Sequence, residues 1–226
     1  MKRSFAIGDI HGCACTFRQL LFGVIRLGKS DTVYLLGDYI DRGPDSKGVI
    51  EAIIELQQQG YDLKPILGNH EDLLITALDS GDFDCYSDWL VNGGRATLKS
   101  YGAKHGEDIP PKHLDFMREL PALRMTRGHV LVHAGLNFRL DDPLTGTSRS
   151  DMLWERRVTV ESAKIGGRKL VTGHSILDLE EIRESLTRDH IRLDNGCWYS
   201  RNYPGCGNLL ALELNSGELF VQHHMG

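Results

Sequence analysis

The chain has 226 residues, enough for one sizeable hydrophobic core, and its apolar and charged fractions are ordinary for a soluble globular protein. Its formal net charge is -5 and it has no run of Lys or Arg, so we expect neither nucleic acid nor a membrane as a partner. After the basic Lys2 and Arg3, the apolar stretch is too short for a signal peptide or a membrane span, and we expect a cytoplasmic protein.

Apolar runs that stop near a glycine alternate with helix-like stretches in the first third of the chain. The apolar runs are residues 5–7, 33–36 and 65–67. The stretches with helical spacing of apolar residues are 16–27, 49–56 and 71–78. Gly28 is the expected C-terminal cap of the first helix. This alternation predicts a mostly parallel sheet, in which ligands bind at the carboxyl ends of the strands.

The middle of the chain, residues 82–120, loses the strand rhythm and predicts a helical insertion broken by Gly93-Gly94. Strand character then returns. The expected later strands are residues 130–132, 169–171, 190–193, 209–214 and 219–222. Asn215-Ser216-Gly217 predicts a hairpin between the last two of these strands. We therefore predict one α/β domain over residues 1–226, a β-sandwich of two mixed sheets flanked by helices.

Three polar motifs directly follow the first three predicted strands. They are Gly8-Asp9-Ile10-His11-Gly12, Gly37-Asp38-Tyr39-Ile40-Asp41-Arg42-Gly43 and Gly68-Asn69-His70-Glu71. Two later strands lead into His133 and His174. Because such strand ends meet in one crevice, we expect six metal ligands to converge there. The candidate ligands are Asp9, His11, Asp38, Asn69, His133 and His174.

These six residues have the composition of a site for two divalent cations. Asp9 and His11 would share one face of an extended segment, and Asp38 could bridge two ions about 3.5–4 Å apart. The cations would outweigh the two carboxylates and attract a phosphate anion into an otherwise acidic protein. Imidazole and carboxylate ligands fit Mn, with Fe or Zn as alternatives. Any one residue alone could be a loop cap or a structural histidine, so only the joint pattern carries the prediction.

Two other patterns carry less weight. Residues 23–30 match the GxxxxGK[ST] phosphate loop in letters, but a phosphate loop follows a strand and opens a helix, whereas these residues finish a helix. The five cysteines are odd in number and lack paired CxxC spacing, so we expect reduced thiols. A zinc site on Cys13 and Cys15 has no evident second pair, and we interpret Cys13 as a passive thiol beside the metals.

The motifs resemble the phosphoprotein phosphatase branch of the calcineurin-like metallophosphoesterases, over residues 5 to about 214. Later segments carry the same resemblance: His133-Ala134-Gly135, Gly173-His174 and, most similar to bacterial and phage serine/threonine phosphatases, residues 89–94 and 153–156. The resemblance implies the metallophosphoesterase sandwich and a centre of two metal ions. The implied ligands are Asp9, His11 and Asp38 for one ion, and Asp38, Asn69, His133 and His174 for the other.

The same resemblance implies the catalytic roles. His70 is the expected general acid, Asp41 the carboxylate that orients it, and Arg42 a phosphate clamp. Arg156 is the expected second clamp, although the residues alone leave Arg157 and other arginines open. A hydroxide bridging the two metals would attack phosphorus in line while His70 protonates the leaving oxygen, without a phosphoenzyme.

Three functions are compatible with these residues. The first is a phosphomonoester hydrolase acting on phosphoserine or phosphothreonine in proteins, or on small phosphoesters, and residues 89–94 and 153–156 favour it. The second is a symmetrical dinucleoside tetraphosphate hydrolase. Leu67 favours this alternative, because phosphatases of the branch often carry Arg before the third motif. The third is a catalytically inactive phosphate-binding scaffold. We rank the protein phosphatase first.

Overall fold

The computed structural model describes residues 2–199 and 204–225, and within them nine strands form two sheets. The five-stranded sheet has the order β3-β2-β1-β8-β9 and consists of β1 (Ser4–Ile7), β2 (Thr32–Leu35), β3 (Asp62–Pro65), β8 (Asn208–Glu213) and β9 (Leu219–His223). The four-stranded sheet has the order β4-β5-β6-β7 and consists of β4 (Leu123–Met125), β5 (His129–Val132), β6 (Lys169–Thr172) and β7 (His190–Arg192). Both sheets contain parallel and antiparallel pairs, so the predicted α/β sandwich of mixed sheets is confirmed.

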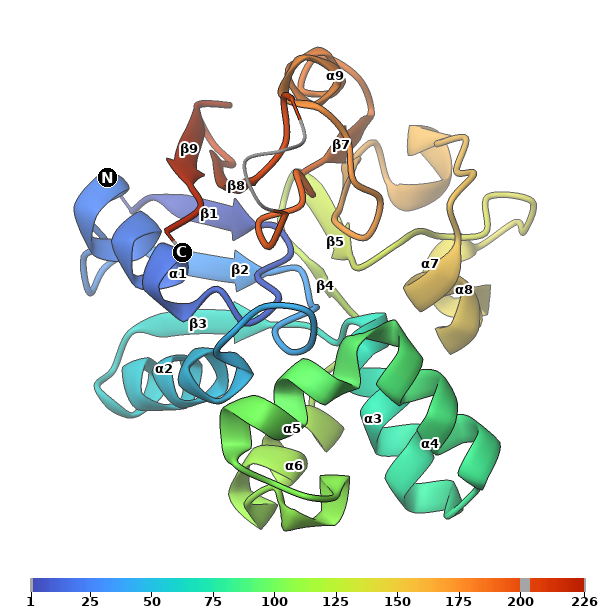
Figure 1. Ribbon diagram of the computed structural model, residues 1–226. Coiled ribbons are helices and arrows are strands. Elements are labelled where there is room, and N and C mark those ends of the chain that lie inside the picture. Colours follow the sequence, from blue (N-terminus) through green and yellow to red (C-terminus); the bar gives the residue numbers. More distant parts are fainter. Residues whose placement is uncertain (1, 200–203, 226) are drawn as a thin grey trace.

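Helices surround the two sheets (Figure 1). The α-helices are α1 (Ala14–Gln19), α2 (Ser46–Gln58), α3 (Asn69–Ser80), α4 (Phe83–Trp89), α5 (Arg95–Tyr101), α6 (Pro111–Arg118), α7 (Pro143–Gly146), α8 (Arg149–Trp154) and α9 (Leu179–Ser185). The π- and 3-10 turns are η1 (Leu20–Val24), η2 (Leu90–Gly94), η3 (Gly106–Asp108) and η4 (Ser162–Ile165). Helices α3 to α6 gather beside the β3 edge (Figure 1). Across the described ranges, no helix is long and apolar enough to cross a lipid bilayer.

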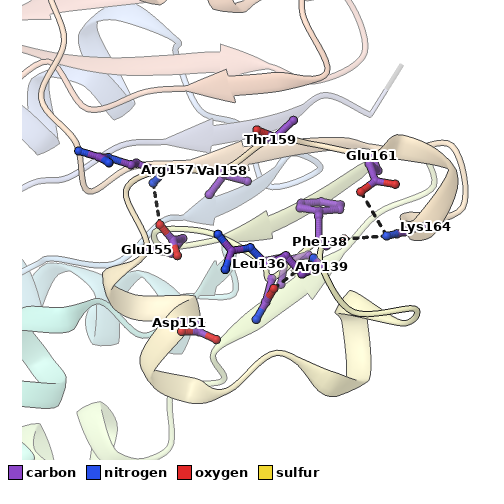
Figure 2. A pocket seen from close by; sticks show the side chains of 11 residues that line it. Leu136, Phe138, Arg139, Asp151, Glu155, Arg157, Val158, Thr159, Glu161 and Lys164 are labelled. Carbon is purple, nitrogen blue, oxygen red and sulfur yellow. Dashed lines mark hydrogen bonds and ion pairs between the residues drawn. The ribbon is translucent and has the colours of Figure 1, made fainter.

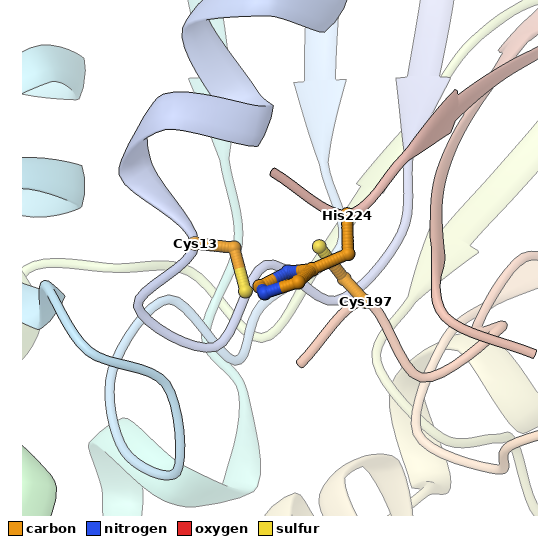
Figure 3. A group of neighbouring side chains, drawn as sticks. All are labelled: Cys13, Cys197 and His224. Carbon is orange, nitrogen blue, oxygen red and sulfur yellow. The ribbon is translucent and has the colours of Figure 1, made fainter. Parts of the chain in front are cut away.

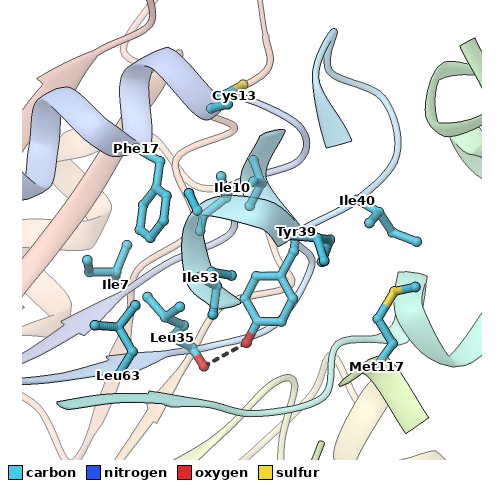
Figure 4. Close-up of a cluster of buried hydrophobic side chains, with 14 of the residues drawn as sticks. Ile7, Ile10, Cys13, Phe17, Leu35, Tyr39, Ile40, Ile53, Leu63 and Met117 are labelled. Carbon is cyan, nitrogen blue, oxygen red and sulfur yellow. Dashed lines mark hydrogen bonds between the residues drawn. The ribbon is translucent and has the colours of Figure 1, made fainter. Parts of the chain in front are cut away.

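Alternate residues of β1 contribute to two different hydrophobic cores. Phe5 and Ile7 belong to the core that includes Phe17 of α1 and Ile53 of α2, part of which Figure 4 shows. Ala6 belongs to the core between the two sheets. That second core includes Ala6, Leu36, Ile66, Leu131, Val171, Ile191, Leu193, Leu210 and Leu212. The sandwich therefore has a sheet-to-sheet core and a separate helix-to-sheet core.

The first helix differs from its prediction. Helix α1 passes into the π-turn η1, and Arg26 rather than Gly28 has a left-handed backbone, with a φ of 49°. Gly28 instead donates its N–H to Asp31 Oδ2 at 2.9 Å, just before β2. Residues 23–30 therefore end a helical segment and precede a strand, the opposite context from a phosphate loop.

Two strands and one helix also differ from the sequence predictions: β3 ends early, β4 was not predicted, and α3 begins early. Strand β3 ends at Pro65 instead of running to Leu67, whose N–H bonds to the carbonyl of Pro121 at 2.9 Å. Strand β4 has only three residues, none of them fully buried, which is too short for an alternating pattern to reveal. Helix α3 begins at Asn69, two residues before its prediction, so the third motif forms the start of a helix.

Candidate metal centre

Hydrogen bonds join the loops that follow the strands of the two sheets. The N–H of His11, after β1, donates to the carbonyl of Asp38, after β2, at 2.8 Å. The N–H of His174, after β6, donates to the Asp9 carboxylate at 3.0 Å and ties the second sheet to the first. The loops that carry the candidate ligands are thus fixed to one another, as expected for strand ends that share a crevice.

Asp38 lies at the centre of the site, and each of its carboxylate oxygens faces a different group of histidines. Oδ2 is 3.4 Å from His11 Nε2 and 3.9 Å from His70 Nε2. Oδ1 is 3.4 Å from His133 Nε2. Two groups result: His11 with Asp38 and His70, and Asp38 with His133 and His174. Within each group, the potential ligand atoms lie within 4.8 Å of one another. One buried carboxylate therefore connects two sets of metal-ligating atoms, as a bridging ligand must.

Asn69 completes the second group. Its Oδ1 is 2.7 Å from Nε2 of His133 and 3.0 Å from Nδ1 of His174. Nδ1 of His133 lies 2.8 Å from the carbonyl of Leu36. Since a carbonyl only accepts, this nitrogen carries the proton and leaves Nε2 with a lone pair that faces the group. The structure thus brings together the four residues expected around the second ion.

The first group differs from its expected membership. Nδ1 of His11 donates to the carbonyl of Ile40 at 2.9 Å, so Nε2 carries the lone pair, which faces Arg42 Nη1 at 2.8 Å in the metal-free protein. The Asp9 carboxylate accepts the N–H of His174 and belongs to neither compact group, whereas His70 takes the third place. The chain turns at His11, whose φ is 45°. Asp9 and His11 therefore do not lie on one face of an extended segment, contrary to the sequence prediction. Metal binding by Asp9 stays a prediction.

The donor set fits divalent cations electrostatically. Burial raises the pKa of Asp9 well above its usual range, and the neighbouring Asp194 adds to this. Burial lowers the pKa of His11 and brings that of His174 to about 3. His174 Nε2 is buried and has no hydrogen-bond partner in the described part of the chain. Bound cations would stabilise the carboxylates, and neutral imidazole is the form that coordinates metal.

His70 and Asp41 form the expected acid pair. His70 Nδ1 is 2.8 Å from Asp41 Oδ2, while its Nε2 is buried and, among the described residues, has no partner. Burial lowers the pKa of His70, but the carboxylates of Asp38 and Asp41 outweigh it and raise the pKa above its usual value. The other Asp41 oxygen accepts from Thr97 Oγ1 at 2.6 Å and Trp89 Nε1 at 3.2 Å. In the sequence, Trp89 is singled out only as part of the family resemblance, and nothing marks Thr97.

Glu71 positions the loop after β2, a role that sequence reasoning also misses. One of its oxygens accepts the N–H groups of Tyr39 and Ile40 at 2.7 and 3.1 Å, and the other accepts the N–H of Asp38 at 3.0 Å. Burial and the nearby Asp38 raise the pKa of Glu71 to about 8. Its place as the last residue of the third motif was the available signal.

Backbone strain concentrates at the candidate centre. Within the described ranges, six non-glycine residues have positive φ. Five of them are candidate site residues: His11, Asp38, Asp41, Arg42 and His174. Such conformations cost about 1–3 kcal/mol each and persist only where the surrounding structure enforces them. Their clustering supports a functional site where the loops meet.

Two arginines border the centre. Arg42 Nη1 lies 2.8 Å from His11 Nε2, and its guanidinium is 5.3 Å from the ring centre of Trp198. Arg156 is exposed just after α8. It lies two residues after Trp154, whose ring centre is 6.0 Å from that of His174, and its charge adds to the burial that lowers the pKa of His174. These positions suit the two predicted phosphate clamps.

A surface cavity of about 430 Å³ lies beside the same segment (Figure 2). Arg157 is part of its wall, together with Glu155 and an ion pair between Lys164 and Glu161 at 3.2 Å. None of the six candidate ligands lines this cavity, so it is separate from the metal centre. Arg156 therefore stays the predicted second clamp.

Gly173 leaves no room for a side chain, because a Cβ there would overlap Asp9 Oδ1. We expect Gly173→Ala to displace the Asp9 carboxylate and weaken metal binding by about 10–100-fold, as when a partner of a metal ligand is disturbed. Gly128→Ala is the control, since a Cβ there would meet nothing within 4 Å. Isothermal titration with Mn²⁺ compares the two variants. Equal affinities would remove Asp9 from the metal centre.

Two groups of histidines around one carboxylate, at the strand ends of an α/β sandwich, define a metallophosphoesterase site. The chain belongs to the calcineurin-like phosphoesterase family, which matches residues 3–200. The predicted superfamily is therefore confirmed.

Two curated proteins and one solved structure are similar to this chain. The symmetrical bis(5'-nucleosyl)-tetraphosphatase of Delftia acidovorans is 33% identical over 125 residues, 48% of this chain and 43% of that protein. The zinc-dependent endopolyphosphatase of Saccharomyces cerevisiae is 31% identical over 152 residues, 64% of this chain and 44% of that protein. The chain thus spans less than half the length of either. A solved structure with the provisional name diadenosine tetraphosphatase has a TM-score of 0.72 and a sequence identity of 21%. The match covers 100% of this chain and 95% of the chain in that structure, and it supports the fold alone.

Proposed function

We propose that this protein is a two-metal hydrolase that cleaves the phosphoanhydride chain of dinucleoside tetraphosphates. The observation that carries the hydrolase assignment is the Asp38 carboxylate, whose two oxygens face different histidines at 3.4 Å. The proposed ligands are Asp9, His11 and Asp38 for one ion, and Asp38, Asn69, His133 and His174 for the other. Mn stays the expected metal, with Fe or Zn as alternatives.

The residues around this centre supply binding and a proton. Arg42 and Arg156 would bind phosphate oxygens, whose charge must be stabilised during transfer. His70 would donate the proton on Nε2 to the leaving oxygen, and Asp41 would hold Nδ1 and favour the charged imidazole. When bound, the metal ions supply positive charge for the phosphate and make the attacking water more acidic.

Two observations support the choice of substrate. The curated relatives are named as a tetraphosphatase and an endopolyphosphatase, and both names describe substrates made of linked phosphates. Leu67, directly before the third motif, is buried in the core and adds no positive charge to the centre. The serine/threonine phosphatase that the sequence ranks first has less support, because these names favour its alternative.

Product analysis after separate incubation with diadenosine tetraphosphate and a phosphoserine peptide tests the proposal. In the presence of Mn²⁺ we expect the tetraphosphate to give two molecules of ADP, the symmetrical outcome, and the peptide to release phosphate much more slowly. Faster hydrolysis of the peptide would restore the protein phosphatase. If neither substrate nor an activated aryl phosphate is hydrolysed, the inactive scaffold becomes the better description.

A further inference from the structure

Cys13, Cys197 and His224 form a thiol–imidazole cluster outside the candidate metal centre (Figure 3). Their potential ligand atoms lie within 4.8 Å of one another. Cys13 follows the first motif, Cys197 follows β7 and His224 follows β9, so three distant segments meet here. Figure 3 shows the two sulfur atoms and the imidazole turned toward one another. Cys15, the neighbour of Cys13 in sequence, is exposed and has no part in the cluster.

The backbone at His224 is held in place, whereas Nδ1 of its imidazole lacks a hydrogen-bond partner among the described residues. The N–H of His224 donates to the carbonyl of Gly207, and the N–H of Met225 donates to Thr16 Oγ1, both at 3.0 Å. Nδ1 of His224 is buried and has no hydrogen-bond partner in residues 2–199 and 204–225. A buried polar nitrogen without a partner costs stability, and coordination to a metal would satisfy it. The cluster therefore differs from two cysteines that merely fill an apolar core.

The two thiols are enclosed by protein. Cys13 and Cys197 are only 2% and 1% exposed. A hydrogen bond with Cys13, together with burial, raises the pKa of the Cys197 thiol well above its usual range. Coordination would release the thiol protons to solvent.

We propose that Cys13, Cys197 and His224 bind one thiophilic metal ion, of the Zn²⁺ type, at a site separate from the two-metal centre. Two sulfur ligands and one imidazole favour Zn²⁺ over Mn²⁺ or Mg²⁺, which prefer oxygen. Zn²⁺ is also bound by three protein ligands at sites where a water molecule takes the fourth position. The three segments that carry these ligands would then be fixed to one another.

The proposed ion would also stabilise one wall of the metal centre. Cys13 lies two residues after His11, and Cys197 directly precedes Trp198. The Trp198 ring centre is 6.3 Å from that of His11 and 5.3 Å from the guanidinium of Arg42. Metal binding at the cluster would therefore restrain both a candidate ligand and the aromatic ring beside a phosphate clamp.

Titration of the Mn²⁺-loaded protein with Co²⁺ tests the proposal, because only sulfur ligands give a sulfur-to-cobalt charge-transfer absorption in the near ultraviolet. The candidate two-metal centre offers only oxygen and nitrogen, so it contributes no such band. We expect about one sulfur-bound Co²⁺ per chain in the wild type and in Cys15→Ser, the matched control. Cys13→Ser and Cys197→Ser should lose most of the band. His224→Ala should bind this Co²⁺ at least about 10–100-fold more weakly, since loss of even an outer partner has that effect.

An absent band in the wild type, or an unchanged band in both serine variants, would overturn the proposal. If circular dichroism shows that the serine variants do not fold, His224→Ala decides, because it removes only a side chain of the tail. Unchanged affinity for sulfur-bound Co²⁺ in that variant would then refute the site. A Cys13–Cys197 disulfide, seen as two missing thiols before reduction and no metal uptake after it, would refute it as well.

Discussion

Replacing Asp38 with alanine should remove both ions of the two-metal centre and lower turnover of diadenosine tetraphosphate by about 10³-fold or more. The expected size follows because the ions provide several kcal/mol of charge stabilisation, and each 1.36 kcal/mol corresponds to about a tenfold change in rate. Burial would raise the pKa of Asp38, but the surrounding histidines bring it below its usual range, so the side chain is a carboxylate anion. Metal content after gel filtration, measured with turnover, checks the result.

Variants of histidines that belong to only one of the two groups provide the comparison for Asp38→Ala. His11→Ala and His133→Ala should each weaken one ion and leave the other in place, because each histidine belongs to only one compact group. Asp31→Asn removes a buried carboxylate that pairs with Arg3 at 2.5 Å, at the opposite end of β2 from Asp38, and should retain both ions. If Asp38→Ala keeps one normally bound ion, Asp38 does not bridge the two groups.

The meeting of the candidate ligands could be predicted because each follows the end of a strand by a few residues. Strands β1 and β2 are parallel neighbours, so their short loops bring Asp9 and Asp38 to the same edge of one sheet. His133 and His174 follow β5 and β6, which are also parallel neighbours. Periodicity predicts both edges but not their meeting across the sandwich, which was expected from the rule that ligands bind at the carboxyl ends of strands.

Contacts between distant side chains could not be read from local patterns. Trp89 and Thr97 reach Asp41 from 48 and 56 residues away, and nothing in their own segments marks them as partners of a carboxylate. Glu71 is a buried acid in the first turn of a helix, where an exposed side chain would be the ordinary expectation. The backbone N–H groups that stabilise it belong to a loop more than thirty residues earlier. The meeting of Cys13 with His224 depends likewise on the path of the whole chain.

Replacing His70 with asparagine should lower turnover of an alkyl phosphate by about 10²–10⁴-fold, the usual contribution of general acid catalysis. His70 Nε2 is buried and free to donate, and Asp41 holds Nδ1 at 2.8 Å. An activated aryl phosphate should lose much less, because its leaving group scarcely needs a proton. Diadenosine tetraphosphate should fall between them, since its leaving group is a phosphate oxygen. Turnover of the three substrates at saturating Mn²⁺ gives the comparison.

The pH dependence of the same variant adds an independent readout. Because the carboxylates of Asp38 and Asp41 raise the pKa of His70, its acid form is present below that raised pKa and is lost as the pH rises through it. Turnover of the alkyl phosphate by the wild type should therefore fall on the alkaline side, and His70→Asn should lack this limb. For the comparison of alkyl and aryl phosphates, Arg42→Ala is the control. Its loss of charge stabilisation should lower turnover of both substrates by similar factors, because it depends little on the leaving group. An equal defect of His70→Asn on alkyl and aryl phosphates, at normal metal content, would show that His70 is not the acid.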